Sequence, residues 1–453
     1  MRVIIVGAGE VGSHLADKLA QENKEVVIID LNPGVLDKIS EQMDVQTIVG
    51  SGSSPGILEQ AGIKDADILL AVTDSDEINL IACTFANILK PGITKLARIR
   101  NDEYTRFREA FSREMLGIEL VINPEVEVVR TIQRLMGAPD AVDVSEFAEG
   151  KVRLIGIWVR EQSVLAGTRL TRIREKVGTT RLIIGAIVRN EELIIPTGED
   201  VVQAGDLIYF VCQEKDQDEI LRSFGGRPKA MKNVLIIGGG NIGFRLAREL
   251  EKGEFHTKLI ETDLARCEFL SEALEKTVIL QGDGTDQSLL KEENIHAMDV
   301  AVTVTGDEET NILCSLLAKS MDAGMTITRI NNFAYFPLVR TIGIEHTVSP
   351  RQSAVNAILH HVRRGRVISA VSIKEEAEVL EAVALENSEV VDKPVKDIDF
   401  PRGAVILCII RKEEVVIPTG LSVIHPLDRI IILAKQKAIS AVEKALMVKL
   451  EKF

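Results

Sequence analysis

The chain begins Met1-Arg-Val-Ile-Ile-Val-Gly-Ala-Gly-Glu-Val-Gly12, and this opening stretch decides the fold. Its apolar run predicts a strand, its spaced glycines a tight turn, and the amphipathic segment 13–22 a helix. In such a motif Gly7 makes the turn, Gly9 lets a pyrophosphate approach the backbone, and Gly12 lets helix and strand pack closely. The free N–H groups at the start of the helix would then bind the phosphates.

An acidic residue stands where the second predicted strand ends. The apolar run 25–30 closes on Asp30, 18 positions after Gly12. In a parallel sheet this strand would bring the carboxylate of Asp30 to the ribose hydroxyls of a dinucleotide. The same carboxylate would repel a 2′-phosphate, so NAD is favoured over NADP. The residues expected to bind the cofactor in this half are Gly7, Ala8, Gly9, Glu10, Val11, Gly12, Asp30, Thr73, Asp74 and Arg98.

Strands and helices alternate through the first third of the chain. Further runs rich in Val, Ile and Leu lie at 45–49, 67–73, 95–99 and 117–122. The pattern predicts an α/β fold, a doubly wound parallel sheet with helices on both faces and ligands outside the carboxyl ends of its strands. At that edge Thr73 and Asp74 would reach the ligand, and Arg98 would pair with a phosphate. For Thr73 and Arg98 the alternative is ordinary polarity at a strand end.

The whole pattern recurs in the second half of the chain. The turn Gly238–Gly243 repeats the first one 231 positions later, and Glu261 stands where the first half has Asp30. A repeat of this length indicates duplication of a whole domain, because solenoid repeats span only a few tens of residues. The second set of expected cofactor-binding residues is Gly238, Gly240, Asn241, Ile242, Gly243, Glu261, Asp283, Thr305 and Arg329. Gly239 is an extra glycine without an assigned role, and in either half a lobe kept only as scaffold is the alternative.

A smaller segment of short strands follows each Rossmann-like half. The phrase Ile-Pro-Thr-Gly occurs at 195–198 and again at 417–420. Closely spaced short strands with turn signals predict a compact, mainly β or α+β module. The Gly- and Pro-containing stretches 137–141 and 225–229 read as hinge and linker. The expected domains are two Rossmann-like lobes, each followed by a small lobe, at 1–136, 137–224, 232–364 and 365–453.

Composition narrows the class of protein. A chain of 453 residues is expected to form two to four domains. No apolar run approaches the roughly 18 residues that span a bilayer, and Met1 leads straight into a core strand, so secretion is not expected. The five cysteines are scattered, as is typical of reduced, mostly buried thiols in a cytosolic protein. A net charge of −14 argues against nucleic-acid binding.

Residue types that carry catalysis or hold metals are scarce. The seven histidines lie mostly singly and no Ser-Lys, Tyr-Lys or GxSxG arrangement is well placed, so no catalytic residue and no enzyme activity are expected. No Cys or His pair has the spacing of a metal site, because His360 and His361 would point to different sides of a helix. The acidic runs 74–77 and 307–309 either hold a hard cation or begin helices.

Tandem glycine-turn lobes, each followed by a small lobe bearing Ile-Pro-Thr-Gly, resemble the TrkA family. Members of that family are peripheral cytosolic subunits of bacterial Trk potassium-uptake systems, and their lobes are of the RCK (or KTN) type. The resemblance covers essentially the full length. The motifs that carry it are Gly7–Gly12, Asp30, Leu58–Ile63, Thr73–Asn79, Gly238–Gly243, Gly282–Asp286 and Thr305–Asn311. One departure is visible: the first lobe has Gly50-Ser51 where related lobes carry Gly-Asp, as at Gly282-Asp283, so the two sites are expected to differ in ligand preference.

The resemblance implies a nucleotide-sensing regulator. NAD or NADH would occupy the Rossmann-like lobes, and ATP and ADP would act as regulatory ligands. The partner would be a membrane-embedded Trk potassium translocating subunit, with this chain peripheral on the cytoplasmic face of the inner membrane. Two paired lobes per chain and closed symmetry favour a homo-oligomer, most simply a tetramer forming a ring of eight lobes.

Helices with apolar stripes and one basic run complete this expectation. The helical stretches 103–111, 124–136 and 350–361 would pack between lobes or between subunits. The basic run 360–366 is a phosphate-facing patch, a contact with the membrane partner, or a plain exposed helix end. The competing hypotheses are an NAD-dependent oxidoreductase with a small unknown substrate and a redox-sensing DNA-binding protein, against which the acidic charge speaks.

Overall fold

The computed structural model describes most of the chain in two compact units. The described residues are 1–101, 103–104, 116–177, 182–225, 231–332, 335–362, 367–373, 376–386, 388–412 and 414–446. One unit comprises residues 1–128 and 349–362, and the other comprises residues 129–348 and 363–453. Among the described residues, no helix has the length and apolar character needed to cross a membrane.

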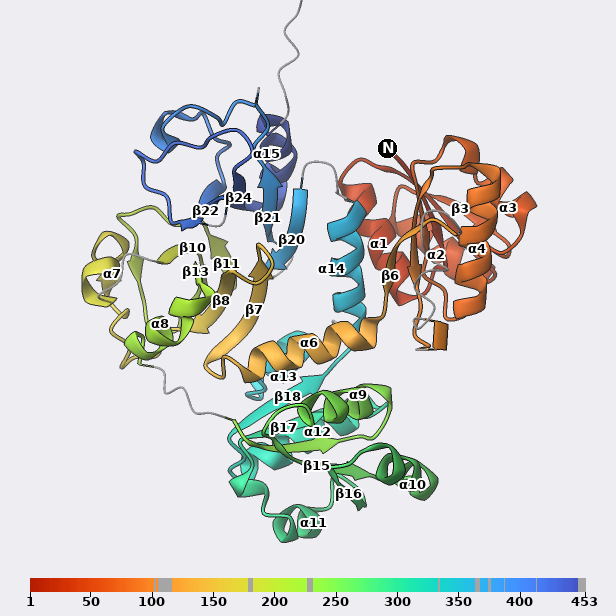
Figure 1. Ribbon diagram of the computed structural model, residues 1–453, viewed down its shortest axis with the longest axis vertical. Coiled ribbons are helices and arrows are strands. Elements are labelled where there is room, and N and C mark those ends of the chain that lie inside the picture. Colours follow the sequence, from red (N-terminus) through yellow and green to blue (C-terminus); the bar gives the residue numbers. More distant parts are fainter. Residues whose placement is uncertain are drawn as a thin grey trace, which may run out of the picture. The chain divides into compact units, whose positions relative to one another are not determined.

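The first lobe is a six-stranded parallel sheet (Figure 1). Its strands are β1 (Arg2–Val6), β2 (Glu25–Asp30), β3 (Gln46–Val49), β4 (Ile68–Ala71), β5 (Thr94–Arg98) and β6 (Ile118–Ile122). Its helices are α1 (Glu10–Gln21), α2 (Pro33–Gln42), α3 (Pro55–Gln60) and α4 (Asp76–Leu89). The strand order β3-β2-β1-β4-β5-β6 is that of a dinucleotide-binding sheet, with its topological switch between β1 and β4.

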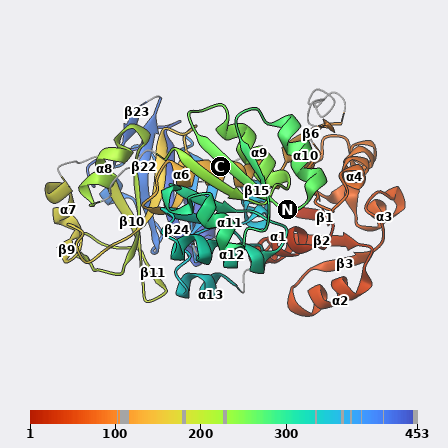
Figure 2. The same ribbon diagram turned by 90° about the horizontal axis from the view of Figure 1, so that it is seen from below.

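Buried aliphatic side chains hold this sheet between two helical layers. Val3 and Ile5 of β1 face one core cluster with α1, whereas Ile4 and Val6 face another with α3 and α4. Successive side chains of a strand point to opposite faces, so a strand buried on both faces needs an unbroken apolar run. Figure 2 shows β1, β2 and β3 side by side, with α2 outside them.

The second lobe repeats this architecture element for element. Its strands are β14 (Asn233–Ile237), β15 (His256–Glu261), β16 (Val278–Gln281), β17 (Val300–Thr303), β18 (Met325–Arg329) and β19 (His346–Val348). Its helices are α9 (Asn241–Leu250), α10 (Leu264–Ala273), α11 (Gln287–Glu292), α12 (Glu308–Ser320) and α13 (Phe336–Thr341). The strand order β16-β15-β14-β17-β18-β19 matches that of the first lobe. The expected duplication of an α/β Rossmann-like lobe is confirmed.

Each small lobe is built on a five-stranded antiparallel sheet. The first has β7 (Ala141–Phe147), β8 (Val152–Trp158), β10 (Leu182–Arg189), β11 (Glu192–Ile194) and β13 (Leu207–Gln213), with β9 (Thr168–Arg169), β12 (Val201–Val202), α7 (Leu170–Val177) and α8 (Gln217–Ser223) around them. The second has β20 (Val367–Ile373), β21 (Ala377–Val383), β22 (Ala404–Arg411), β23 (Glu414–Val416), β24 (Arg429–Lys435) and α15 (Ile439–Ala445). The expected α+β character of these lobes is confirmed.

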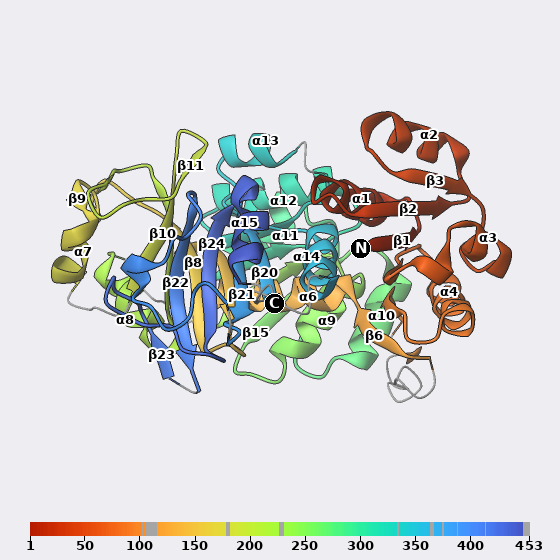
Figure 3. The same ribbon diagram turned by 90° about the horizontal axis from the view of Figure 1, so that it is seen from above.

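The two small lobes belong to one unit and share a core. Their sheets come together in Figure 3, where β10 and β22 run close to each other. One apolar cluster contains side chains from both small lobes. The first lobe contributes Phe147, Leu154 and Val211, and the second contributes Val379, Leu407 and Leu433. Polar contacts cross the same seam, since buried Glu381 accepts from the N–H of Ala148 at 3.1 Å. The small lobes therefore form an intrachain pair.

Two helices follow the last strands of the Rossmann-like lobes: α6 (Pro124–Met136) and α14 (Pro350–Val362). α14 follows the second lobe in sequence, yet it packs on α1 and β6 of the first lobe. The structure thus places α14 of the second repeat on the first lobe, and its packing between lobes or between subunits stays a prediction. Most of the predicted helix 103–111, namely residues 105–111, lies outside the described residues. The arginines of the basic run, at 363, 364 and 366, lie outside them as well.

Candidate functional site

The glycine turn of the first lobe has the geometry that its spacing predicts. Gly7 adopts φ +105°, a left-handed conformation, and a Cβ there would lie 2.9 Å from the backbone nitrogen of Thr73. A Cβ on Gly12 would lie 1.8 Å from the carbonyl oxygen of Gly7, so only glycine lets α1 approach β1. Gly9 differs, because a Cβ there would have no atom within 4 Å. The space beside Gly9 is therefore open for a ligand.

The second lobe reproduces each of these three environments. Gly238 has φ +108°, and its Cβ would lie 2.7 Å from the backbone nitrogen of Thr305. A Cβ on Gly243 would lie 1.9 Å from the oxygen of Gly238, whereas one on Gly240 would again meet nothing within 4 Å. Both lobes therefore keep an open face over the N-terminus of a helix, α1 in the first lobe and α9 in the second.

The two predicted ribose acids face these turns. Asp30 ends β2, and its carboxylate accepts from the N–H of Ala8 at 2.7 Å and from that of Asn32 at 2.9 Å. Glu261 ends β15 and accepts from the N–H groups of Gly239 at 2.8 Å and Thr262 at 2.7 Å. Each carboxylate is thereby fixed beside the turn, the position from which an acid reaches the ribose in dinucleotide-binding folds generally.

The environment of Glu261 keeps it ionised. Burial alone would raise the pKa of this carboxyl. Backbone N–H groups of Asp263, Gly239 and Thr262 outweigh that effect and hold the pKa of Glu261 below its usual value. The site therefore presents an anionic acceptor to any ribose hydroxyl that reaches it.

The structure gives Gly239 a role that the sequence pattern did not. A Cβ at this position would lie 2.5 Å from Leu270 Cδ1 and 3.0 Å from Glu261 Oε2. In the first lobe Ala8 stands at the equivalent position beside the shorter Asp30. Glu261 is longer than Asp30, and Gly239 is smaller than Ala8, so the two differences compensate. Both lobes therefore keep a hydrogen bond from the turn N–H to the carboxylate.

Thr73 and Arg98 lie at the predicted carboxyl edge, and buried Asn79 joins them. The amide of Asn79 accepts from the N–H and the hydroxyl of Thr73 at 2.9 and 2.7 Å, and it donates to the carbonyl of Arg98 at 2.8 Å. Asn311 repeats the contacts to Thr305 and to the carbonyl of Arg329. Both asparagines stand in the repeated motif that flanks the strand end, but spacing alone gave them no role.

The charges at this edge differ between the lobes. Arg98 Nη1 pairs with Asp74 Oδ1 at 3.1 Å. Burial, and then the nearby Arg100, lower the pKa of Arg98, whereas Asp74 opposes that shift. In the second lobe Gly306 replaces Asp74, and Arg329 Nη1 donates to the carbonyl of Thr305 at 2.8 Å. In the first lobe a phosphate would have to compete with Asp74 for the guanidinium of Arg98.

The third strands end differently, as the sequence indicated. Asp283 follows β16, and its carboxylate accepts from the N–H and the hydroxyl of Thr285, both at 2.8 Å. Those hydrogen bonds lower the pKa of Asp283. At the corresponding place in the first lobe, the hydroxyls of Ser51 and Ser53 lie 2.8 Å apart. One lobe therefore offers a carboxylate at this edge, and the other offers hydroxyls.

The acidic runs begin helices. Ser75 caps α4, and the carboxylate of Asp76 accepts from the N–H groups of Arg100 and Asn101 at 3.0 and 2.8 Å. Asp307 caps α12 in the same way by accepting from the N–H of Thr310 at 2.7 Å. Of the two alternatives for these runs, the structure supports the helix start. Within the described ranges, no group of three or more Asp, Glu, His or Cys side chains could hold a metal ion.

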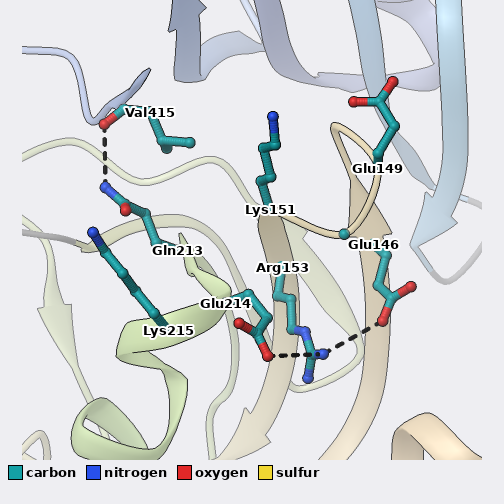
Figure 4. A pocket seen from close by; sticks show the side chains of 9 residues that line it. Glu146, Glu149, Lys151, Arg153, Gln213, Glu214, Lys215 and Val415 are labelled. Atoms are coloured by element: carbon teal, nitrogen blue, oxygen red, sulfur yellow. Dashed lines mark hydrogen bonds and ion pairs between the residues drawn. The ribbon is translucent and has the colours of Figure 1, made fainter. Parts of the chain in front are cut away.

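Two cavities lie away from the glycine turns. One, of about 480 Å³, opens where the two small lobes meet (Figure 4). It is lined mainly by charged side chains of the first small lobe, and Val415 of the second small lobe also lines it. Its Arg153 lies 3.5 Å from both Glu146 and Glu214, so this guanidinium is paired with two carboxylates (Figure 4). The other, of about 520 Å³, adjoins the first residues of β14, β15 and β16, at the amino edge of the second sheet.

Two dinucleotide-type Rossmann lobes in tandem, each followed by an α+β lobe, define the class of this protein. A TrkA-N domain model matches residues 3–124 and 234–350, and a TrkA-C domain model matches residues 147–225 and 379–447. The chain belongs to the family of Trk system potassium uptake proteins TrkA. The resemblance seen in the sequence motifs is confirmed.

Relatives match along nearly their whole length. The Trk system potassium uptake protein TrkA of Halomonas elongata is 38% identical over 441 residues, which cover 96% of each chain. The protein of the same name from Azorhizobium caulinodans is 36% identical over 458 residues, with complete coverage of both chains. A solved structure described as "GsuK channel bound to NAD" is 17% identical, covers 98% of this chain and 78% of that one, and has a TM-score of 0.60. That last likeness is one of fold.

Proposed function

We propose that this chain is the cytosolic regulatory subunit of a Trk-type potassium-uptake system. It binds NAD or NADH in its Rossmann lobes, responds to ATP and ADP, and gates a membrane-embedded potassium translocating subunit from the cytoplasmic face of the inner membrane. The observation that carries the proposal is the pair of open turns at Gly9 and Gly240, each facing a fixed carboxylate. Two such sites in a family named for potassium uptake support sensing of nucleotides.

The ligand would lie across the carboxyl edge of each sheet. The N–H groups of residues 8–12 and 239–243 would hold the pyrophosphate, helped by the dipoles of α1 and α9. Asp30 and Glu261 would accept from the ribose hydroxyls. Thr73, Asp74 and Arg98, with Asp283, Thr305 and Arg329 in the second lobe, would border the rest of the ligand.

The proposal assigns no catalytic residue. Hydride transfer to a substrate normally needs an acid–base group matched to it. At the edge of the first lobe, the hydroxyl of Thr73 is occupied by Asn79, and Arg98 pairs with Asp74. These contacts hold the ends of β4 and β5 in place, which is a structural role and not an acid–base role. The alternative, an NAD-dependent oxidoreductase with a small substrate, shares the same turns and acids, and it predicts turnover of NADH.

Potassium flux is the decisive measurement. The membrane subunit in liposomes would be assayed with and without this chain, in the presence of ATP, ADP, NAD or NADH. We expect flux to depend on the nucleotide and on the chain. The variants Gly9→Val and Gly240→Val serve as controls, because each fills one open face. Flux indifferent to all four nucleotides would refute the proposal, and steady loss of NADH absorbance with a small substrate would favour the oxidoreductase.

The same proposal includes a homotetramer, a ring of eight Rossmann and small lobe pairs. Closed cyclic or dihedral symmetry is the usual arrangement of soluble homo-oligomers. Light scattering coupled to size exclusion would give about 199 kDa for four chains of 49.8 kDa. A mass of one chain at all concentrations would contradict a ring.

A further inference from the structure

The helix that covers α1 in the first lobe comes from the second repeat. Ala354, Val355 and Ile358 of α14 are buried in the same apolar cluster as Leu15 and Leu19 of α1. The valine, isoleucine and leucine side chains in this cluster contribute about 1.5–3 kcal/mol each when fully buried. α14 is therefore a fixed part of the first lobe, although 227 residues, 123–349, separate it from β6 in the sequence.

The direction of α14 follows from the ion pairs at its two ends. Near its start, Arg351 Nη1 lies 3.9 Å from Glu10 Oε2, and Glu10 is the first residue of α1. Near its end, His361 Nε2 lies 3.3 Å from Oε2 of Glu119, which belongs to the beginning of β6. A parallel strand begins at the amino edge of its sheet. The N-terminus of α14 therefore lies at the carboxyl edge, beside the glycine turn.

The edge where phosphates would bind thus carries three positive features. Two helix N-termini, those of α1 and α14, point there with their partial positive charge. The third is the guanidinium of Arg351, whose side chain is 19% exposed. Its ion-pair partner Glu10 is 66% exposed, so this carboxylate is free to turn into solvent. Because Glu10 is the first residue of α1, a guanidinium that reaches its carboxylate lies near the helix N-terminus that is expected to hold the pyrophosphate.

We propose that Arg351 is a phosphate-binding residue of the first nucleotide site, supplied by the second repeat. The inference rests on the proposed nucleotide-binding function. The guanidinium pairs with Glu10, and a bound pyrophosphate would replace that carboxylate as its partner. Charge-assisted bonds from arginine to phosphate are short and often bidentate. Ligand in the first lobe then tightens the hold on α14, so nucleotide binding and the position of α14 are thermodynamically linked.

The sequence restricts this phosphate-binding arginine to the first nucleotide site. α6 begins Pro124-Glu125, where α14 begins Pro350-Arg351. The first repeat therefore carries a carboxylate at the position where the second repeat carries the arginine. Substitution of Arg351 should affect binding by the first lobe alone.

The test uses the full-length chain with the second site blocked by Gly240→Val. Affinities for ADP and adenosine are measured by calorimetry or by displacement of NADH fluorescence. On this background we expect Arg351→Gln to weaken ADP binding about ten- to a hundredfold. Adenosine, which lacks phosphates, should bind within about twofold of its former affinity. Arg351→Lys should retain part of the ADP affinity, because lysine keeps the positive charge but lacks the planar guanidinium that binds phosphate through two N–H groups.

Control variants separate charge from mere loosening of α14. Arg160→Gln removes a guanidinium whose side chain is 73% exposed in the first small lobe, and it should leave both affinities unchanged. His361→Ala loosens the far end of α14, and it should not change the ratio of the ADP and adenosine affinities. If Arg351→Gln leaves ADP binding unchanged, or weakens ADP and adenosine equally, the inference is overturned while the proposed function stands. If the parent chain binds no NADH or ADP, the proposed function itself fails.

Discussion

At the scale of single residues, the glycines of each turn fall into two kinds. Gly12 and Gly243 are required by the fold, because a Cβ would collide with a carbonyl oxygen at 1.8 or 1.9 Å. Gly9 and Gly240 have extended backbones and open surroundings, so the fold itself does not need them to be glycine. Their small size matters only if something else must approach the backbone.

This distinction predicts opposite effects for two substitutions in one turn. Gly9→Val should leave the melting temperature nearly unchanged but abolish nucleotide binding by the first lobe. Gly12→Ala should destabilise that lobe by about 1–3 kcal/mol, because α1 must move away from β1. Thermal melts and NADH titrations of the two variants are the measurements. Undiminished NADH binding by a Gly9→Val, Gly240→Val double variant would show that the turns do not hold the ligand.

Glu261 gives a prediction about pH. The N–H groups around it depress its pKa in the fold, so its contribution to stability is present above the ordinary value of 4.5 and is lost as pH falls through the depressed pKa. Glu261→Gln should therefore lower the free energy of unfolding by about 1 kcal/mol at neutral pH, a modest figure because the group is partly exposed. Chemical denaturation across acidic and neutral pH would measure the difference. A difference that grew on acidification would contradict the assignment.

At the scale of elements, buried polar side chains hold the strand ends in register. Asn79 bridges the ends of β4 and β5, and Asn311 bridges those of β17 and β18. The small lobes differ, because each of two facing strands, β10 and β22, contains a β-bulge. The register of β10 shifts at Gly185, and that of β22 shifts at Leu407. A Cβ on Gly185 would lie 2.6 Å from Leu407 Cδ2, so the two irregular points meet.

The meeting of these bulges predicts a coupled pair of substitutions. Gly185→Val should destabilise the small-lobe pair by about 1–3 kcal/mol, because buried Leu407 has little room to move. Leu407→Ala alone should cost about 2–5 kcal/mol through the cavity it leaves. Together they should cost less than the sum, since the new methyl groups enter that cavity. Denaturation of the four proteins of this double-mutant cycle measures the coupling, and strict additivity would mean that the bulges do not touch.

At the scale of the whole molecule, the protein distributes its cores over four lobes and buries a thiol in each of them. All five cysteines are free and buried, which confirms the expectation of reduced, buried thiols. Burial raises the pKa of Cys83, Cys212, Cys314 and Cys408 to about 12 in each case. A thiol with such a pKa forms almost no reactive thiolate at neutral pH.

Thiol labelling therefore reports on the integrity of every lobe at once. The native protein should react slowly with a disulfide reagent at neutral pH, and all five thiols should react at once in denaturant. Cys267 is 6% exposed, whereas the other four cysteines are fully buried, so it should be the first to react even though burial and nearby carboxylates raise its pKa. Rapid labelling of Cys408 in the native protein would show that the small lobes separate readily.

The sequence alone determined the local and repeated features of this protein. Alternating apolar runs, the glycine turns and the acids at residues 30 and 261 predicted two Rossmann-like lobes and their ligand edges. These signals are short-range, because strand, turn and helix follow one another within about 30 residues in such a unit. The tertiary structure decided the packing of α14 on the first lobe, the closeness of Arg351 to Glu10, and the roles of Asn79 and Gly239. Those depend on side chains brought together from distant parts of the chain, and no local spacing records which surfaces of a folded lobe remain to be covered.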